Sequence, residues 1–148
     1  MVHALEEIHR LLKPGGTLIE LHPSLEPPPS VEVRASGRRS FSEVEPAFDY
    51  DVDDLRRAER AVATAVDGGV FTRDGQRRFE LRTHASSVEE LRDYWVVYGA
   101  YDAEEKGETL LRRQDEMYAR VQDVVQRAPG AEIVYVEPAT MSRLTPRG

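Results

Sequence analysis

The 148-residue chain contains no cysteine, which excludes a disulfide framework, a zinc site with thiolate ligands and thiol catalysis. Lysine is nearly absent, and 27 acidic residues against 20 basic ones give a formal charge of −7. This acidic balance argues against nonspecific nucleic-acid binding, because contacts to phosphates need a surplus of Lys and Arg. No apolar run is long enough to span a membrane, and the first residues lack the basic start and the apolar run of a signal peptide. We therefore expect a cytoplasmic protein.

The first twenty residues carry the most specific pattern in the chain. Apolar residues at helical spacing predict a helix over 2–13, and Pro14 followed by two glycines predicts a tight exit from it. The mostly apolar, β-prone run 17–21 predicts a buried strand. A helix, a Pro-Gly-Gly turn and a central strand together form half of a parallel α/β unit.

The rest of the chain reads as a mixture of hairpins and helices. Alternation of apolar and polar residues, with turn residues between, predicts hairpins, and capping residues ahead of periodic apolar stripes predict helices. The predicted elements are a hairpin of 31–34 with 38–41, a helix over 52–66, a hairpin of 70–73 with 77–83 around Asp74-Gly75, helices over 86–97 and 108–127, a buried strand 133–136, and an edge segment 141–145 set apart by Pro138.

Residues 4–20, Ala-Leu-Glu-Glu-Ile-His-Arg-Leu-Leu-Lys-Pro-Gly-Gly-Thr-Leu-Ile-Glu, resemble the segment around the fifth strand of class I S-adenosylmethionine-dependent methyltransferases. The resemblance implies an α/β fold in which the chain forms the C-terminal portion of a Rossmann-like methyltransferase sheet with an inserted α+β cap. It further implies that residues 1–148 are a single, incomplete domain, truncated at its front, with residues 30–105 as the candidate cap.

In that family the cofactor lies against a Gly-rich turn after the first strand and an acidic residue that ends the second. Both features precede the segment that residues 4–20 resemble. The glycines of this chain show no G-x-G spacing, and Gly15-Gly16 belong to a helix exit, whereas an anion site needs a helix entrance. We therefore expect no cofactor-binding residues here, no binding of S-adenosylmethionine by this chain alone, and no catalysis unless an N-terminal half is supplied.

Four residues are candidates for contact with a small-molecule substrate: Glu20, His22, Tyr94 and Tyr98. Glu20 and His22 lie at the carboxyl end of the predicted strand, where open α/β sheets bind ligands. In the methyltransferases that the chain resembles this edge faces the substrate, so the resemblance implies that His22 is a substrate contact or general base. The alternative is a half-exposed loop histidine. The two tyrosines line an aromatic pocket or, at i, i+4 spacing, a core stripe. The histidine spacing predicts no metal site, because His3 and His9 are six residues apart.

Two functions from different classes follow. The first is the C-terminal part of a methyltransferase that acts on a small-molecule acceptor and is inactive alone. The alternative is a non-catalytic α+β domain that binds a ligand or another protein. If strands of the sheet are missing, the segment 18–21 presents an unpaired apolar edge. We therefore expect a homodimer or a strand-exchanged assembly through it.

Overall fold

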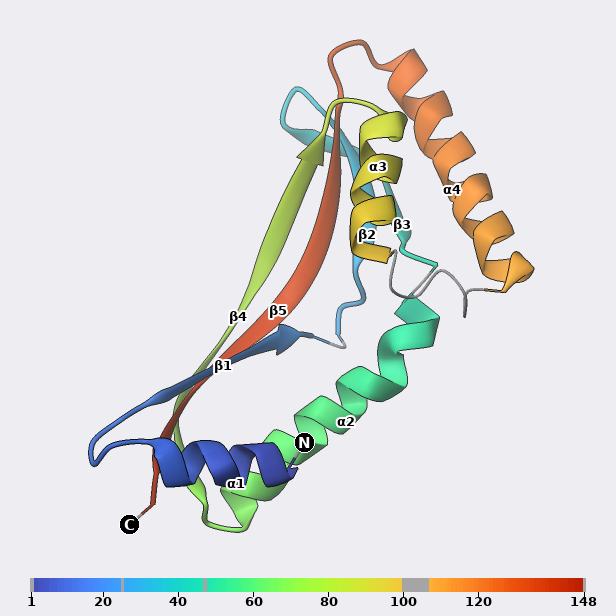
Figure 1. The fold of residues 1–148 in the computed structure, drawn as a ribbon. Coiled ribbons are helices and arrows are strands. Elements are labelled where there is room, and N and C mark those ends of the chain that lie inside the picture. The colour runs from blue at the N-terminus through green and yellow to red at the C-terminus, as the bar shows by residue number, and fades with distance from the viewer. Residues whose placement is uncertain (1, 25, 47, 100–106, 148) are drawn as a thin grey trace. The chain divides into compact units, whose positions relative to one another are not determined.

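The computed structural model describes residues 2–24, 26–46, 48–99 and 107–147, and Figure 1 shows their helices and strands. This part of the chain has a mixed α/β fold in which every strand pair with a defined register is antiparallel. The elements in chain order are α1 (Val2–Leu11), β1 (Leu18–Pro23), β2 (Ser30–Ala35), β3 (Arg38–Val44), α2 (Phe48–Asp67), β4 (Phe71–Ala85), α3 (Val88–Gly99), α4 (Glu108–Arg127) and β5 (Glu132–Pro146).

The residues group into two compact units, each with its own hydrophobic core. Unit 1 comprises Met1–Pro27, Tyr50–Glu80 and Pro138–Gly148, and unit 2 comprises Pro28–Asp49 and Leu81–Glu137. The long strands β4 and β5 therefore contribute one part to each unit. Unit 2 differs in extent from the cap predicted over residues 30–105, because it includes α4 and omits most of α2.

In unit 1 the strands β1 and β4 both pair with β5, and α1 and α2 supply the helical part. The pairing of β1 with β5 is antiparallel and runs from Leu18 opposite Leu144 to Pro23 opposite Ala139. The core combines side chains from both helices with side chains from the strands. Its members are Leu5, Ala61, Val62, Ala65, Phe71 and Leu144, with Ile8, Leu12, Leu18, Val66 and Val70 packed against them.

In unit 2 the strands β2 and β3 form the predicted hairpin, and β2 also pairs with β5. The turn of the hairpin has positive φ angles of 51° at Ser36 and 74° at Gly37. Helices α3 and α4 pack on these strands (Figure 1). The core consists of Val31, Val33, Ala85, Val88, Leu91, Met117, Tyr118, Val121, Ile133 and Tyr135.

The predicted helices are all present, and local rules explain their ends. Helix α1 ends ahead of Pro14, and Gly15 takes the positive φ of 75° that the tight exit requires. At the start of α3 the hydroxyl of Ser87 accepts a hydrogen bond of 3.1 Å from the Glu90 N–H. The Glu90 carboxylate in turn accepts bonds from the backbone N–H and the hydroxyl of Ser86, so its pKa is lowered.

The strand β1 differs from its prediction in orientation and position. The prediction of a central strand in a parallel unit is wrong for the pairing that the structure describes, because β1 pairs antiparallel with β5 and stands at the end of the sheet order. One face is also exposed, with Ile19 at 55% and Leu21 at 56% of their full accessible area. Residue composition signals burial and β-propensity, and neither property specifies the direction of a partner strand.

The predicted hairpin around Asp74-Gly75 is also wrong, because β4 is one strand of 15 residues. The side chain of Asp74 reaches Thr145 and Arg143, whereas Gln76 reaches Ser142, whose side chain points to the opposite face of β5. In a regular strand residues i and i+2 share a face, so the alternation is interrupted at Gly75. The Asp-Gly pair therefore marks an irregularity within a strand, where glycine often occurs.

The last predicted break, at Pro138, is absent as well, because β5 is a single strand of 15 residues. The Pro138 carbonyl accepts a hydrogen bond of 2.7 Å from the Ser24 N–H, so this residue faces the β1 edge of β5. Along that edge β5 changes its partner strand. Val136 pairs with Ser30, the first residue of β2, and Ala139 pairs with Pro23, the last residue of β1. The missing N–H of Pro138 thus falls where no ladder bond is needed.

Candidate functional site: a polar cluster at the end of β1

The side chains of β1 that face the core change from apolar to polar along the strand. Leu18 belongs to the core of unit 1, and because side chains alternate in a strand, Glu20 and His22 point to the same face as Leu18. Their partners across the antiparallel pair are Ser142 and Thr140, which share that face. The result is a polar cluster next to the apolar core, which we call the His22 cluster: Glu20, His22, Ser24, Glu59, Thr140 and Ser142.

Glu20 and His22 are in direct contact within the cluster. The His22 Nδ1 atom lies 2.5 Å from Glu20 Oε1, and the two side chains are only 10% and 16% exposed. We assign the ring proton to Nδ1, because only then does the imidazole donate to the carboxylate. This contact fixes the orientation of the ring and leaves Nε2 as the atom that can accept or donate a proton.

The second ring nitrogen faces helix α2. His22 Nε2 lies 3.6 Å from Glu59 Oε1, and the Glu59 side chain is 41% exposed. Glu59 therefore lies between the buried histidine and solvent. An imidazole oriented by one carboxylate, with a second carboxylate near its other nitrogen, is an arrangement that can accept a proton from a bound hydroxyl or amine.

The hydroxyl groups of the cluster are buried more deeply than its charged groups. Ser24 and Thr140 are 3% and 4% exposed, and their oxygens lie 2.5 Å apart. Ser142 is fully buried, and its hydroxyl receives a long hydrogen bond of 3.5 Å from Gln76. The Ser24–Thr140 bond therefore links the end of β1 to β5, and the Gln76–Ser142 bond links β4 to β5.

One polar atom of the cluster lacks a partner. The Oε2 atom of Glu20 is buried and has no hydrogen bond from any residue that the structure describes. A buried carboxylate oxygen without a donor is unusual, since the great majority of buried polar groups are hydrogen-bonded. This oxygen could accept a hydrogen bond from a hydroxyl or amine of a bound molecule.

Two of the four site residues predicted from the sequence are in contact, and a third belongs to the other unit. Glu20 and His22 are in direct contact in unit 1. Tyr94 belongs to unit 2, where its ring lies 6.4 Å from that of Tyr135 and packs against the core, as the core-stripe interpretation expects. Tyr98 lies within α3, and its side chain is outside the described part of the chain.

Sequence reasoning missed four members of the cluster: Ser24, Glu59, Thr140 and Ser142. Glu59 lies in the exposed-looking charge pattern of α2 and carries no motif of its own. Thr140 and Ser142 alternate with Ala139, Met141 and Arg143, which is a strand signal, but only the register with β1 shows which residues they face. Register is not encoded in either strand alone.

Unit 2 contains buried ionisable groups that support its own packing. Burial by itself raises the pKa of Glu32, but hydrogen bonds from Arg39 and Arg34 outweigh this effect and leave the pKa lowered. Glu45 is 2% exposed and accepts a hydrogen bond of 3.0 Å from Gln114. Burial raises the pKa of Tyr118, over whose ring the Arg92 guanidinium lies at 4.7 Å.

Among residues 2–24, 26–46, 48–99 and 107–147, no three His, Asp or Glu side chains are grouped so that they could hold a metal ion. None of the described helices combines the length and apolar character required to cross a membrane. No family model matches the chain, and neither a curated protein nor a solved structure matches it.

Proposed function

We propose that the chain is the acceptor-side, C-terminal part of an S-adenosylmethionine-dependent methyltransferase that acts on a small molecule. The observation that carries the proposal is the unit α1–turn–β1, which follows the resembling residues 4–20 element by element. Strand β1 pairs with β5 along one edge only and ends the sheet order, so no described strand occupies its other edge.

The antiparallel pairing of β1 with β5 is compatible with this proposal. Doubly wound sheets often carry an antiparallel strand at the edge of an otherwise parallel sheet. In such a sheet β1 would be a parallel strand, and β5 would be its antiparallel neighbour.

The residues of this chain do not fit the cofactor itself. Gly15 takes a positive φ at the exit of α1, and no described glycine pair stands between a strand and a helix entrance in the way an adenosyl cofactor requires. We therefore derive no methyl-transfer step within this chain. S-adenosylmethionine would supply the methyl group from residues outside it, and the His22 cluster would bind and orient the acceptor.

In this proposal His22 acts on the acceptor through Nε2. Glu20 holds the ring by its contact with Nδ1, and the free Oε2 atom of Glu20 accepts a hydrogen bond from the acceptor. An acceptor with an amine or with two hydroxyls matches both features, since one N–H or O–H can donate to Glu20 while another loses its proton to His22. The carboxyl ends of strands are also where α/β sheets bind ligands.

The test combines cofactor binding with the reading frame of the gene. Calorimetric titration of this chain with S-adenosylmethionine is expected to give no heat of binding, and micromolar affinity would contradict the assignment of the cofactor to other residues. DNA upstream of Met1 is expected to encode, in frame, a Gly-rich strand–turn–helix, and a stop codon directly before Met1 would argue against the proposal. In the longer product, His22→Gln is expected to lower kcat by about 100-fold while the Kd for S-adenosylmethionine stays unchanged.

The second candidate is a non-catalytic α+β domain that binds a ligand or a protein. It is favoured by the strand pairing, because every register that the structure defines is antiparallel and no parallel pair occurs among the described strands. In this case S-adenosylmethionine would not bind to any natural product of the gene. A cytoplasmic location stays a prediction under either function.

Both functions share one expected assembly, a homodimer or strand exchange through the free edge of β1. The strand also carries Ile19 and Leu21 on its outer face, both more than half exposed, and an edge strand that is apolar and exposed favours pairing with a second copy. Sedimentation equilibrium is expected to give twice the mass of 16.8 kDa, and Leu21→Lys is expected to shift the protein to monomer. A wild-type protein that remains monomeric at about millimolar concentration, well above the usual Kd of weak dimers, would contradict this expectation.

A further inference from the structure

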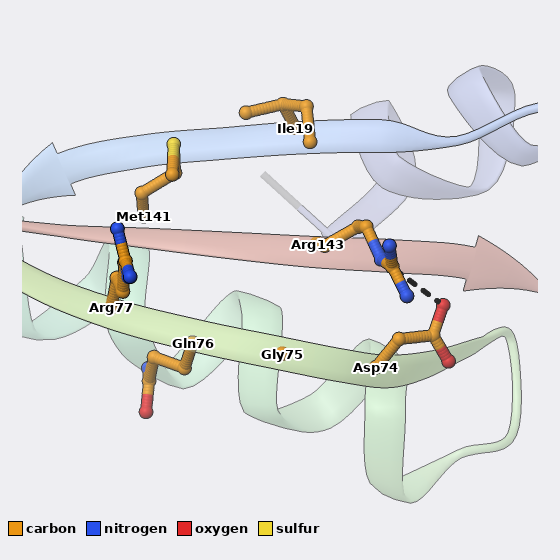
Figure 2. A pocket seen from close by; sticks show the side chains of 7 residues that line it. All are labelled: Ile19, Asp74, Gly75, Gln76, Arg77, Met141 and Arg143. Atoms are coloured by element: carbon orange, nitrogen blue, oxygen red, sulfur yellow. Dashed lines mark ion pairs between the residues drawn. The ribbon is translucent and has the colours of Figure 1, made fainter.

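The outer face of the unit 1 sheet, opposite the His22 cluster, contains a groove across three strands (Figure 2). The groove has a volume of about 370 Å³, within the range of small-molecule sites. Ile19 from β1 and Met141 from β5 form its apolar part, and residues 74–77 of β4 form its opposite side. Gly75 contributes no side chain, and a Cβ atom built on it meets nothing within 4 Å.

The irregularity at Gly75 explains why the groove has charged ends. Because the alternation of side chains is interrupted there, Asp74 and Arg77 both point to the outer face, and Gln76 points away from it (Figure 2). Asp74 is held by Thr145, whose hydroxyl donates a bond of 2.8 Å, and it lies 3.8 Å from Arg143. The Asp74–Arg143 pair therefore closes one end of the groove.

Arg77 lies at the other end, beside Met141, and its charge is not neutralised (Figure 2). No residue in the described ranges forms an ion pair or hydrogen bond with its guanidinium. Two arginines against one aspartate leave one positive charge in excess in the groove of a chain whose formal charge is −7. An unpartnered guanidinium presents several donors in a planar fork that matches a carboxylate.

A second exposed apolar side chain of β1, outside the lining of the groove, lies on the same face. Leu21 stands opposite Met141 in the strand pairing and shares the face of Ile19, and both leucine and isoleucine side chains are more than half exposed. Ile19 and Met141 line the same groove as Arg77. A ligand that matches this surface has a negative group at one end and an apolar chain or ring at the other.

We propose that this groove binds a small carboxylic acid with an apolar body, with the carboxylate on Arg77 and the apolar body against Ile19 and Met141. The proposal is independent of the methyltransferase proposal, because it uses the opposite face of the sheet and no residue of the His22 cluster. Charge complementarity and the apolar strip beside Arg77 select this ligand class over a cation or a neutral alcohol.

The test is a titration of the full chain with octanoate, followed by ¹H–¹⁵N correlation spectra. A ligand of this size is expected to bind with a Kd of about 1 mM and to shift the amide signals of β1, β4 and β5 around the groove. Octylammonium and octanol serve as probes of equal length. Binding of all three probes with equal affinity would overturn the proposal, since it would indicate unspecific apolar adsorption.

Two variants remove different parts of the groove. Arg77→Gln is expected to weaken octanoate binding about tenfold or more, since a charge-assisted hydrogen bond is lost. Gly75→Val is expected to abolish binding, because its side chain occupies the groove while the extended backbone of β4 accepts a β-branched residue. Arg73→Gln, an exposed residue of β4 that does not line the groove, is the matched control and is expected to bind as the wild type does.

Two outcomes would contradict the assignment of the groove. Unchanged octanoate affinity in Arg77→Gln would remove the carboxylate contact on which the proposal depends. Signal shifts at the groove that depend on protein concentration and do not depend on octanoate concentration would show that a second copy of the chain covers this face instead. Native spectra of each variant in the absence of ligand exclude misfolding as the cause of lost binding.

Discussion

Replacing Phe71 with alanine is expected to lower the free energy of unfolding by about 3–5 kcal/mol, the range found for large aromatic side chains removed from a core. Phe71 is fully buried in unit 1, at the start of β4, and belongs to the same core as Leu5 and Leu144. Its ring also meets the His9 ring edge-on at a centroid distance of 5.5 Å. The loss is measured by urea unfolding followed by circular dichroism.

The matched control for this prediction is Phe79→Ala in the same strand. Phe79 is 37% exposed, so its removal leaves no closed cavity and is expected to cost less than about 1 kcal/mol. The His9 ring beside Phe71 donates a hydrogen bond of 3.0 Å from Nε2 to the Arg147 carbonyl, which links α1 to the end of β5. Equal losses in the two variants would show that the core of unit 1 is not packed as described.

Replacing Glu32 with glutamine is expected to cost about 2–3 kcal/mol at pH 7, because the change removes a buried charge from between two arginines. Glu32 is 4% exposed. Its Oε2 atom lies 2.7 Å from Arg34 Nη2, and its Oε1 atom lies 2.9 Å from Arg39 Nη1. Urea unfolding of both proteins measures the difference. The measurements extend from about pH 3 to about pH 8, because this range includes the ordinary pKa of a carboxyl group.

The loss is expected to depend on pH in one direction. Burial by itself raises the pKa of Glu32, and the hydrogen bonds and charges of Arg39 and Arg34 bring it below the ordinary value of 4.5. A carboxyl whose pKa is lower in the folded state stabilises the fold fully above its unfolded pKa, and this stabilisation disappears as the pH falls through the folded pKa. The difference between the wild type and the variant should therefore be constant above the ordinary pKa of 4.5 and shrink as the pH falls through the lowered pKa of Glu32.

Glu43→Gln provides the control for a pair on the surface of the same unit. Glu43 accepts a hydrogen bond of 2.8 Å from Arg120 Nε, but the two side chains are 28% and 49% exposed, so solvent screens the pair. Its removal is expected to cost less than about 1 kcal/mol, since most exposed pairs contribute little. A loss for Glu32→Gln that is as small, or that does not change with pH, would contradict the role assigned to the buried carboxylate.

Sequence patterns predicted the local structure where the responsible interactions are local. The helix predicted over 108–127 is confirmed with those bounds, because its apolar stripe and its ends lie within one segment. The hairpin of β2 and β3 is confirmed for the same reason, since the Ser36-Gly37 turn has the positive φ angles such a turn needs. Both elements are specified by residues that are near in sequence.

The wrong predictions all concern strands whose partners are distant in sequence. Asp74-Gly75 and Pro138 are turn or break signals that are correct on average, but both lie within strands of 15 residues. Pairing with β5 keeps β4 extended through Gly75, and the change of partner strand makes Pro138 harmless to the β5 ladder. Tertiary pairing thus outweighs the local preference for a turn.

The candidate site divides in the same way. Glu20 and His22 could be selected from the sequence, because two residues apart on a strand they must share one face. Glu59 is 37 positions after His22 in the sequence (59 − 22), and it approaches His22 only because α2 packs against β1. Thr140 and Ser142 join the cluster through the register of β5, which a shift of one residue would reverse.

By itself the sequence determined which segments are helical, where the α1 exit turns, and that Glu20 and His22 stand together at the end of a strand. Those properties depend on periodicity, capping and backbone preference, which act over a few residues. Only the tertiary structure decided that β1 pairs antiparallel with β5, that the hydroxyls of Thr140 and Ser142 face the His22 cluster, and that Arg77 lies unpaired in a groove. Strand direction, register and the burial of charge arise from contacts between distant segments, and no local pattern contains them.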